Sequence, residues 1–227
     1  MALEPARRRG PVTGGQARGN GRTSAMRLDP EALSIRDFYR WMIHTIVPRP
    51  IAWVSTLDAA GVPNLAPFSF FTAVCAHPPT LMFCPANDRF GRPKDTLANI
   101  EATGEFVVNL VPFALAEKMN ATAATLPRGE SEFARFDVAS EASVVVKPAR
   151  VKGVPIAYEC RLDRVIRFAE GPAAGNAVFG RIVSAYVDDA TIGPDGWPGI
   201  AAMDLVARAG GDFYMRSGEL FAMERPA

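Results

Sequence analysis

The feature that most constrains the fold is a pair of long β-type segments, residues 155–168 and 177–187. In the first segment, apolar residues alternate up to Leu162, and the alternation resumes at Ile166 after an interruption. The interruption predicts a β-bulge near Asp163–Arg164. Long antiparallel strands that carry a bulge are typical of a bent, closed barrel rather than a flat sheet.

Shorter elements precede this pair. Turn residues and apolar runs predict further strands at 51–57, 62–68, 80–84, 105–111 and 142–146, and helices at 95–103 and 113–122. An earlier helix should begin at Asp29-Pro30-Glu31, which has the pattern of a cap and a first-turn proline, and should end before Pro48. The fold class is therefore mainly β with flanking helices. No repeat or boundary divides residues 26–227, so we expect one domain.

Composition excludes several classes of protein. Of the 227 residues, 48% are hydrophobic and 22% are charged, which is average for a globular protein. No apolar run approaches the roughly 18 residues of a membrane span, so we expect a soluble protein without a membrane partner. Residues 1–25 carry a net charge of +4 and the whole chain +1, so the remainder carries −3. The domain therefore offers no basic stripe for nucleic acid.

The N-terminal segment, residues 1–25, is rich in Arg and Gly and has few apolar side chains. We expect it to be disordered, and its removal should leave the fold and ligand binding unchanged. It has no apolar core of a secretory signal. Two interpretations stay open: an Arg-rich transit peptide, or translation that begins at Met26. Three unpaired cysteines, Cys75, Cys84 and Cys160, are typical of buried thiols in a reducing compartment, so we expect a cytoplasmic location.

The common catalytic motifs are missing from the chain. It has no dinucleotide-binding glycine pattern, no P-loop, no nucleophile elbow and no zinc-protease motif. The two histidines, His44 and His77, lie in a predicted helix and beside a Pro-Pro turn, where ordinary structural roles are common. With so few ligand residues, we expect no metal site and no catalytic acid or base.

Hydroxyl and amide side chains gather instead where strands end and one helix begins. In the segment KDTLAN (94–99), Lys94 and Thr96 flank the start of a predicted helix. Free N–H groups at a helix N-terminus, a hydroxyl and a lysine together suit a phosphate group. The alternative is an ordinary surface helix that is capped by Asp95, with Lys94 in solvent.

These segments together resemble one family. RPIAWVST (49–56), NLAPFSFFTAV (64–74), KDTLANIEATGEFVVNLV (94–111) and AGGDFY (209–214), with the Pro-Pro-Thr turn at 78–80, are similar to the flavin reductase-like FMN-binding proteins, which are split-barrel flavoproteins. The resemblance covers about residues 30–224. It implies a homodimer that binds FMN between subunits and uses NADH or NADPH as the reductant.

The resemblance also implies site residues. The isoalloxazine ring and ribityl chain would lie along Trp53, Ser55, Thr56, Phe68, Ser69, Phe70, Phe71 and Thr72, and the phosphate would contact Lys94, Thr96 and Asn99. For Phe68, Phe70 and Phe71 the alternative is core packing, which we expect for at least one of them. Tyr214 matches an aromatic residue that covers the flavin or pyridine ring. Arg208 is near enough in sequence to meet a phosphate, and a solvated arginine is the alternative.

One departure from the family pattern affects the function. Related reductases often carry a histidine that meets the nicotinamide, at a position where this chain has Gly175-Asn176. The first hypothesis is still an NAD(P)H:flavin oxidoreductase, with a monooxygenase as a candidate partner. The second is a non-enzymatic FMN electron carrier. The third, chemistry like that of pyridoxamine-phosphate oxidases, has no motif in its favour.

Overall fold

The computed structural model of the chain describes residues 25–226. The chain divides into two compact units, Met1–Phe38 and Tyr39–Ala227. Nearly all of the N-terminal segment that is predicted to be disordered lies outside the described residues. The expectation for its removal and the predicted single domain, 26–227, therefore stay predictions.

The described part of the first unit confirms the predicted cap at Asp29 but not a continuous helix from that point. Asp29 accepts a hydrogen bond from the N–H of Glu31 at 3.0 Å and caps a short 3-10 helix, η1 (Pro30–Ala32). Helix α1 (Ile35–Thr45) begins as a separate element, continues into the second unit and ends before Pro48, as the proline pattern predicts.

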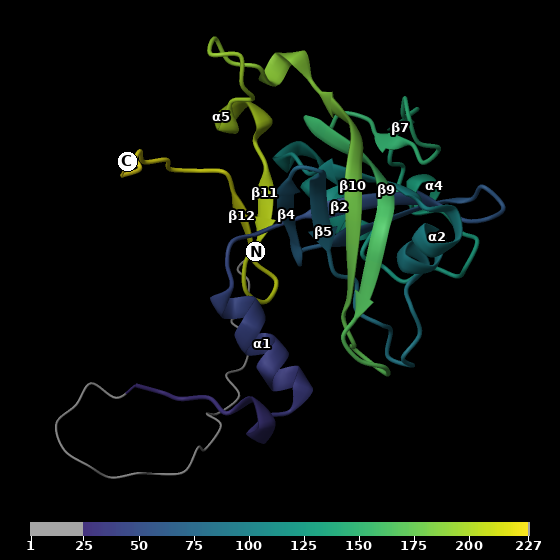
Figure 1. The fold of residues 1–227 in the computed structure, drawn as a ribbon, viewed down its shortest axis with the longest axis vertical. Helices are drawn as coiled ribbons and strands as arrows, with labels where there is room; N and C mark the ends of the chain where they lie inside the picture. The colour runs from purple at the N-terminus through teal and green to yellow at the C-terminus, as the bar shows by residue number, and fades with distance from the viewer. Residues whose placement is uncertain (1–24, 227) are drawn as a thin grey trace, which may run out of the picture. The chain divides into compact units, whose positions relative to one another are not determined.

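A seven-stranded antiparallel sheet dominates the second unit (Figure 1). Its order is β3-β2-β6-β9-β10-β5-β4, with bounds β2 (Ala52–Leu57), β3 (Pro63–Phe68), β4 (Phe71–Ala76), β5 (Pro79–Phe83), β6 (Glu105–Leu110), β9 (Ile156–Arg167) and β10 (Asn176–Val187). The two edge strands, β3 and β4, are consecutive in the chain and separated only by Ser69 and Phe70. The sheet must therefore curve back on itself, which confirms the bent barrel and leaves its seam at this corner.

Alternation along β2 divides the protein into an inner and an outer core. Ala52 and Val54 face the barrel interior, where they lie with Phe83, Phe106 and Cys160 under helix α2 (Asp95–Thr103). Trp53 points the other way, into a cluster under α3 (Ala116–Ala121) and α4 (Glu132–Arg135). Successive strand residues face opposite sides, so one sheet here has apolar residues on both faces.

The remaining described elements are short. They are β1 (Arg49–Pro50), η2 (Phe113–Leu115), β7 (Ser140–Glu141), β8 (Arg150–Val151), η3 (Asp189–Thr191), α5 (Ile200–Met203), β11 (Val206–Arg208) and β12 (Tyr214–Arg216). Strands β1, β11 and β12 form a small separate sheet in that order. No helix among the described residues is long and apolar enough to cross a membrane.

The β9–β10 ladder confirms the predicted bulge. Phe179 pairs with Arg164 and Gly180 pairs with Leu162, so Asp163 is the extra residue. The predicted strand at 142–146 is wrong. The N–H groups of Val144, Val145 and Val146 donate to the buried carboxylate of Glu159 at 2.6–3.0 Å. These bonds supply the acceptors that the carbonyl groups of a neighbouring strand would otherwise provide, and they satisfy the buried carboxylate.

Gly180 should be sensitive to substitution, because an added Cβ would lie 2.2 Å from Cζ of Phe106. Phe106 is fully buried and its ring is held at 5.7 Å from the ring of Phe83. We expect Gly180→Ala to lower the free energy of unfolding by about 1–3 kcal/mol in urea denaturation. Gly218→Ala, whose Cβ would meet its nearest neighbour at an ordinary 3.5 Å, is the control. Equal stability of the two variants would contradict the packing described here.

Candidate functional site

The corner between β3 and β4 carries the predicted aromatic residues. Phe68 is 7% exposed, and its ring lies 5.1 Å from that of Phe83 in the inner core, so core packing explains this residue. Phe70 and Phe71 are partly exposed. The carbonyl of Phe70 accepts the N–H of Cys84 at 2.9 Å and so holds the corner against the end of β5. Thr72 is exposed.

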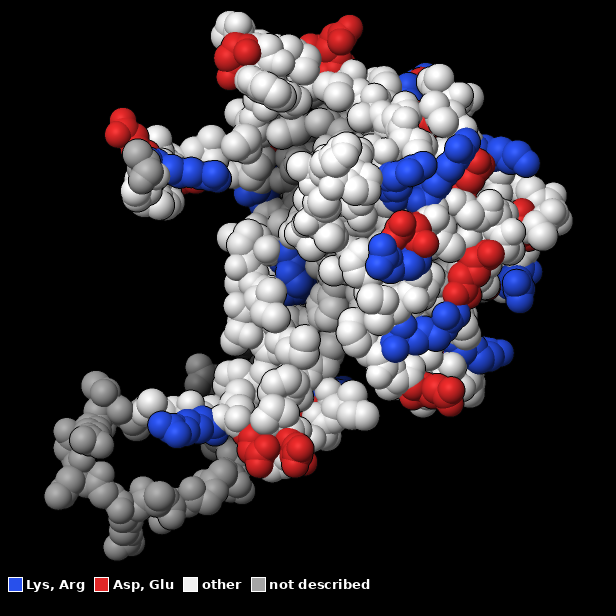
Figure 2. Space-filling view, viewed as in Figure 1, with Lys and Arg blue, Asp and Glu red and all other residues white. Residues whose placement is uncertain are grey.

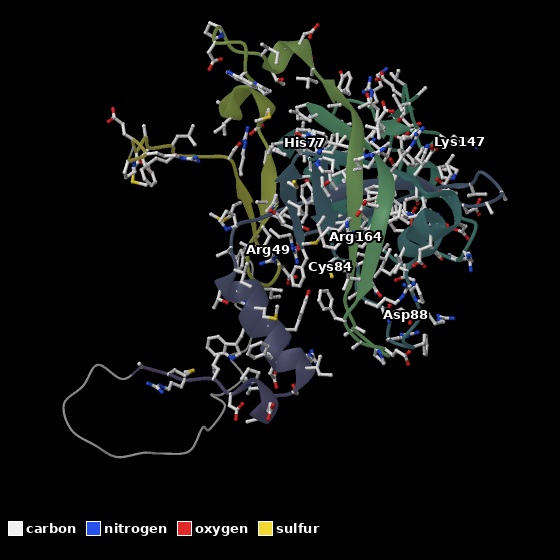
Figure 3. All side chains as sticks on the ribbon, in the orientation of Figure 1. Arg49, His77, Cys84, Asp88, Lys147 and Arg164 are labelled. Carbon is white, nitrogen blue, oxygen red and sulfur yellow. The ribbon has the colours of Figure 1, made fainter. Side chains whose placement is uncertain are left out.

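Arg49, which is labelled in Figure 3, contacts Ser69 of this corner and is only 5% exposed. Its guanidinium donates to the carbonyl oxygens of Ile43 and Ile46, each at 2.7 Å, to Ser69 Oγ at 3.3 Å and to the carbonyl of Ala209 at 3.1 Å. No carboxylate of the described residues pairs with it. Burial lowers the pKa of Arg49, and the charge of Arg208 adds to the effect. The sequence motif contained Arg49, but nothing in the pattern singled it out.

Lys94 and the first turn of α2 form the second part of the site. Lys94, not Asp95, is the N-cap residue, and it makes no side-chain cap. Its ammonium lies 5.7 Å from the ring centroid of Phe68, and no described carboxylate pairs with it. Although the residue is exposed, desolvation by the surrounding protein lowers the pKa of Lys94. Within the described chain, no group accepts the N–H of Asp95 or Thr96.

The side chains of Thr96 and Asn99 point from α2 into the protein, toward β2 and β3, and not toward solvent. Thr96 is 1% exposed and accepts from Asn64 Nδ2 at 3.0 Å, and Asn99 is 4% exposed and donates to Thr56 Oγ1 at 3.1 Å. Asn64 also donates to Thr56 at 3.3 Å. These four residues tie α2 to β2 and β3. They hold the helix N-terminus in place rather than offering hydroxyls to a ligand.

Trp53 and Ser55 belong to the outer core. Both are 0% exposed. The indole N–H of Trp53 donates to Thr122 Oγ1 at 2.9 Å, and Ser55 Oγ donates to the carbonyl of Ala149 at 2.6 Å. Side chains with no accessible surface and satisfied polar atoms have nothing left to present to a ligand, because strand alternation turns them away from the barrel interior.

The C-terminal hairpin brings Arg208 and Tyr214 together. The guanidinium of Arg208 lies 4.5 Å from the Tyr214 ring centroid and donates to the carbonyl of Gly211 at 2.8 Å. Tyr214 is 37% exposed, and its hydroxyl donates to Asn120 Oδ1 at 2.8 Å. Arg208 pairs with Arg49 across β1 and β11, so the hairpin adjoins the corner through Arg49. No motif in the sequence pointed to Asn120 as a site residue.

The position for which the family resemblance implies a histidine, Gly175-Asn176, is closed in this chain. Asn176 is 2% exposed, and its amide donates to Asn87 Oδ1 at 2.8 Å and to the carbonyl of Pro85 at 3.2 Å. A Cβ on Gly175 would lie 3.2 Å from the sulfur of Cys84. Burial raises the pKa of the Cys84 thiol. Neither residue 175 nor residue 176 therefore presents a side chain to a ligand.

The three cysteines are free, as predicted, but they are not equally buried. Cys160 is buried, Cys84 is half-buried and Cys75, on the edge strand β4, is exposed. The expectation of buried thiols holds for Cys160 and is wrong for Cys75, because an edge strand has no neighbour to cover it.

Residues 43–197, more than half of the chain, match the model of the flavin reductase like domain. The chain belongs to the flavin reductase-like family. Relatives without a described function include a protein of Halalkalibacterium halodurans, 36% identical over 88% of this chain and 97% of its own length. The protein YwrF of Bacillus subtilis is 35% identical over 87% of this chain and 97% of its own length.

Solved structures support the same fold. Nitrilotriacetate monooxygenase component B from Bacillus cereus is 30% identical, with a TM-score of 0.83 over 88% of this chain and all of that one. The 2-nitrobenzoate 2-nitroreductase NbaA of Pseudomonas fluorescens is 28% identical, with a TM-score of 0.79 over 88% of this chain and 96% of that one. A flavin reductase-like split barrel is therefore the architecture of residues 39–226.

The described residues fit the phosphate end of a flavin mononucleotide. The ammonium of Lys94 has no described carboxylate partner, and the N–H groups of Asp95 and Thr96 lie at a helix N-terminus with no acceptor in the described chain. A dianionic phosphate would supply the negative charge that the ammonium lacks and the hydrogen-bond acceptor that the N–H groups lack. The carboxylate of Asp95 opposes it, but Arg128 lies 4.0 Å from that carboxylate and offsets its charge.

Proposed function

We propose that this flavin reductase-like protein is an FMN-binding oxidoreductase of the NAD(P)H:flavin reductase type. The observation that carries the proposal is the cationic start of α2, where Lys94 and two free N–H groups lie beside Phe68 and the β3–β4 corner. Bound FMN would accept a hydride from a nicotinamide nucleotide and pass electrons onward.

The chain's own residues would bind and orient the cofactor. Lys94 would neutralise the phosphate, while Thr56, Asn64, Thr96 and Asn99 hold α2 rigid from behind. Ser69, Phe70, Phe71 and Thr72 form the accessible part of the corner, where backbone groups and aromatic edges would contact the ring system. Trp53 and Ser55 would not contact the cofactor and would only pack in the protein core.

The second candidate is an electron carrier that does not react with a nicotinamide nucleotide. The buried Asn176 and the side-chain-free Gly175 favour it, since neither residue can contact a nicotinamide ring. Arg208 and Tyr214 support the reductase, because a guanidinium and an aromatic face suit the phosphate and the ring of a dinucleotide. The likeness to a monooxygenase component B also makes a monooxygenase the candidate acceptor of electrons.

A homodimer is part of the proposal. Large apolar side chains of the second unit are exposed, among them Ile46 at 56%, Phe113 at 50% and Phe213 at 77%. Exposed apolar side chains mark an interaction site where they form a contiguous patch, and these residues are the candidates for such a patch. A second copy is the partner that we expect to cover it.

The experiment is a titration of purified protein with FMN, followed by addition of NADH or NADPH. We expect a yellow complex with about one FMN per subunit and oxidation of the nicotinamide when flavin is supplied. A yellow protein without turnover would support the carrier instead. A protein that neither retains FMN nor quenches its fluorescence would contradict both functions.

A further inference from the structure

The C-terminal tail, residues 218–226, is not packed against any other described part of the chain. It forms no helix or strand, and no hydrogen bond joins it to another described part of the chain. Its apolar side chains are among the most exposed in the described residues: Leu220 at 64%, Phe221 at 80% and Met223 at 80%. Three such side chains in one short segment predict that another surface covers them.

A groove of about 300 Å³ lies beside the point where the tail begins. Its lining comes from η2, α3 and the C-terminal hairpin and consists of Phe113, Ala116, Glu117, Asn120, Val206, Tyr214, Met215 and Arg216. Phe113 is half exposed and Met215 is 46% exposed, so apolar side chains at the groove are open to solvent. The groove therefore suits a short apolar segment.

The two residues before the tail are held firmly to the rest of the second unit. Ser217 donates its N–H to the carbonyl of Leu205 at 2.8 Å, and Arg216 is held by both carboxylate oxygens of Asp204, at 2.5 and 2.8 Å. Beyond these anchors the chain runs outward as a free arm (Figure 1), whose tip carries charged residues (Figure 2). At about 3.3 Å per residue, an extended arm of this length spans roughly 30 Å, which is enough to reach a second molecule.

One charged residue of the tail complements a charged residue at the groove. Glu117 is exposed at the rim, and no described cation pairs with it. In the tail, Arg225 lies two residues after Met223 and pairs with no described carboxylate, while Glu219 and Glu224 flank the apolar segment. Arg225 therefore offers Glu117 a cationic partner, and the apolar side chains between the two glutamates are what the groove would take up.

We propose that the tail of one copy lies in the groove of a second copy, with Phe221 and Met223 against Phe113 and Met215. The exchange is reciprocal, as two-fold symmetry requires, so each tail covers its partner's groove. The inference rests on the homodimer of the proposed function and extends it. The partner's tail would then lie beside the C-terminal hairpin that carries Tyr214.

Disulfide trapping tests the exchange directly. Ala116→Cys and Phe221→Cys are combined in the full chain, with the exposed Cys75 changed to Ser, and the protein is oxidised gently. We expect a covalent dimer on a non-reducing gel. A mixture of two singly substituted proteins, one carrying each cysteine, should give the same dimer after subunits exchange. Ala185→Cys, on the exposed face of β10, replaces Ala116→Cys as the control and should give none.

The outcomes separate this inference from the proposed function. A disulfide within one chain would place the tail in its own groove and overturn the exchange, and so would the absence of any disulfide. A second measurement uses Phe221→Asp together with Met223→Asp in an otherwise full chain. We expect the dimer dissociation constant by light scattering to rise at least ten-fold, and an unchanged constant would overturn the proposal. FMN titration of the unsubstituted protein reports on flavin binding separately.

Discussion

Lys94→Met should weaken FMN binding by one to two decades and leave riboflavin binding nearly unchanged. Methionine keeps an apolar stem of similar length against Phe68, so the variant removes the charge and little else. Charge-assisted hydrogen bonds are worth about 1.5–3 kcal/mol, which corresponds to one to two decades in affinity. Riboflavin has no phosphate and cannot feel the ammonium directly. Fluorescence titration of both flavins gives the comparison.

Thr96→Val is the matched control, and the structure changes the effect that we expect of it on flavin affinity. From the sequence alone, its hydroxyl is expected to contact the phosphate, so its loss should weaken FMN only. Because that hydroxyl is buried and accepts a hydrogen bond from Asn64, we now expect lower stability and similar effects on both flavins. If Lys94→Met reduced FMN and riboflavin affinity equally, the phosphate would not lie at α2.

Arg49→Met should lower the free energy of unfolding by about 3 kcal/mol, because hydrogen bonds from a charged group to buried acceptors are among the stronger ones. The substitution removes the donor that joins the end of α1, the Ser69 corner and the carbonyl of Ala209 before the hairpin turn. Three buried or half-buried carbonyl oxygens then lose their hydrogen-bond donor. Urea denaturation of the apoprotein measures the loss.

Two variants control the Arg49 experiment. Arg135→Met, at an exposed arginine without a described ion pair, should change stability by less than about 0.5 kcal/mol. Arg49→Lys keeps the charge but has a single donor group in place of a fork, so its stability should lie between those of the native protein and Arg49→Met. Native stability in Arg49→Met would show that the guanidinium does not hold these segments together.

Local pattern predicted the elements well where one face of an element stays buried along its length. The predicted helix at 95–103 has the bounds of α2, and the bulge at Asp163 follows from interrupted alternation in β9. The strand predicted at 142–146 failed because three consecutive valines have high β-propensity wherever they occur. A buried carboxylate, Glu159, decided their conformation from another strand.

For the candidate site, the sequence by itself determined which segments we propose for it, since Lys94, the β3–β4 corner and the C-terminal hairpin all lie in the motifs that carry the family resemblance. Only the tertiary structure decided which side chains are accessible. It turned Trp53, Ser55, Thr96 and Asn99 inward. It also brought Arg49 to Ser69 and Ala209, and joined Tyr214 to Asn120. The physical reason is that the periodicity of a strand or helix is a local property, whereas burial depends on whichever distant segment covers each face.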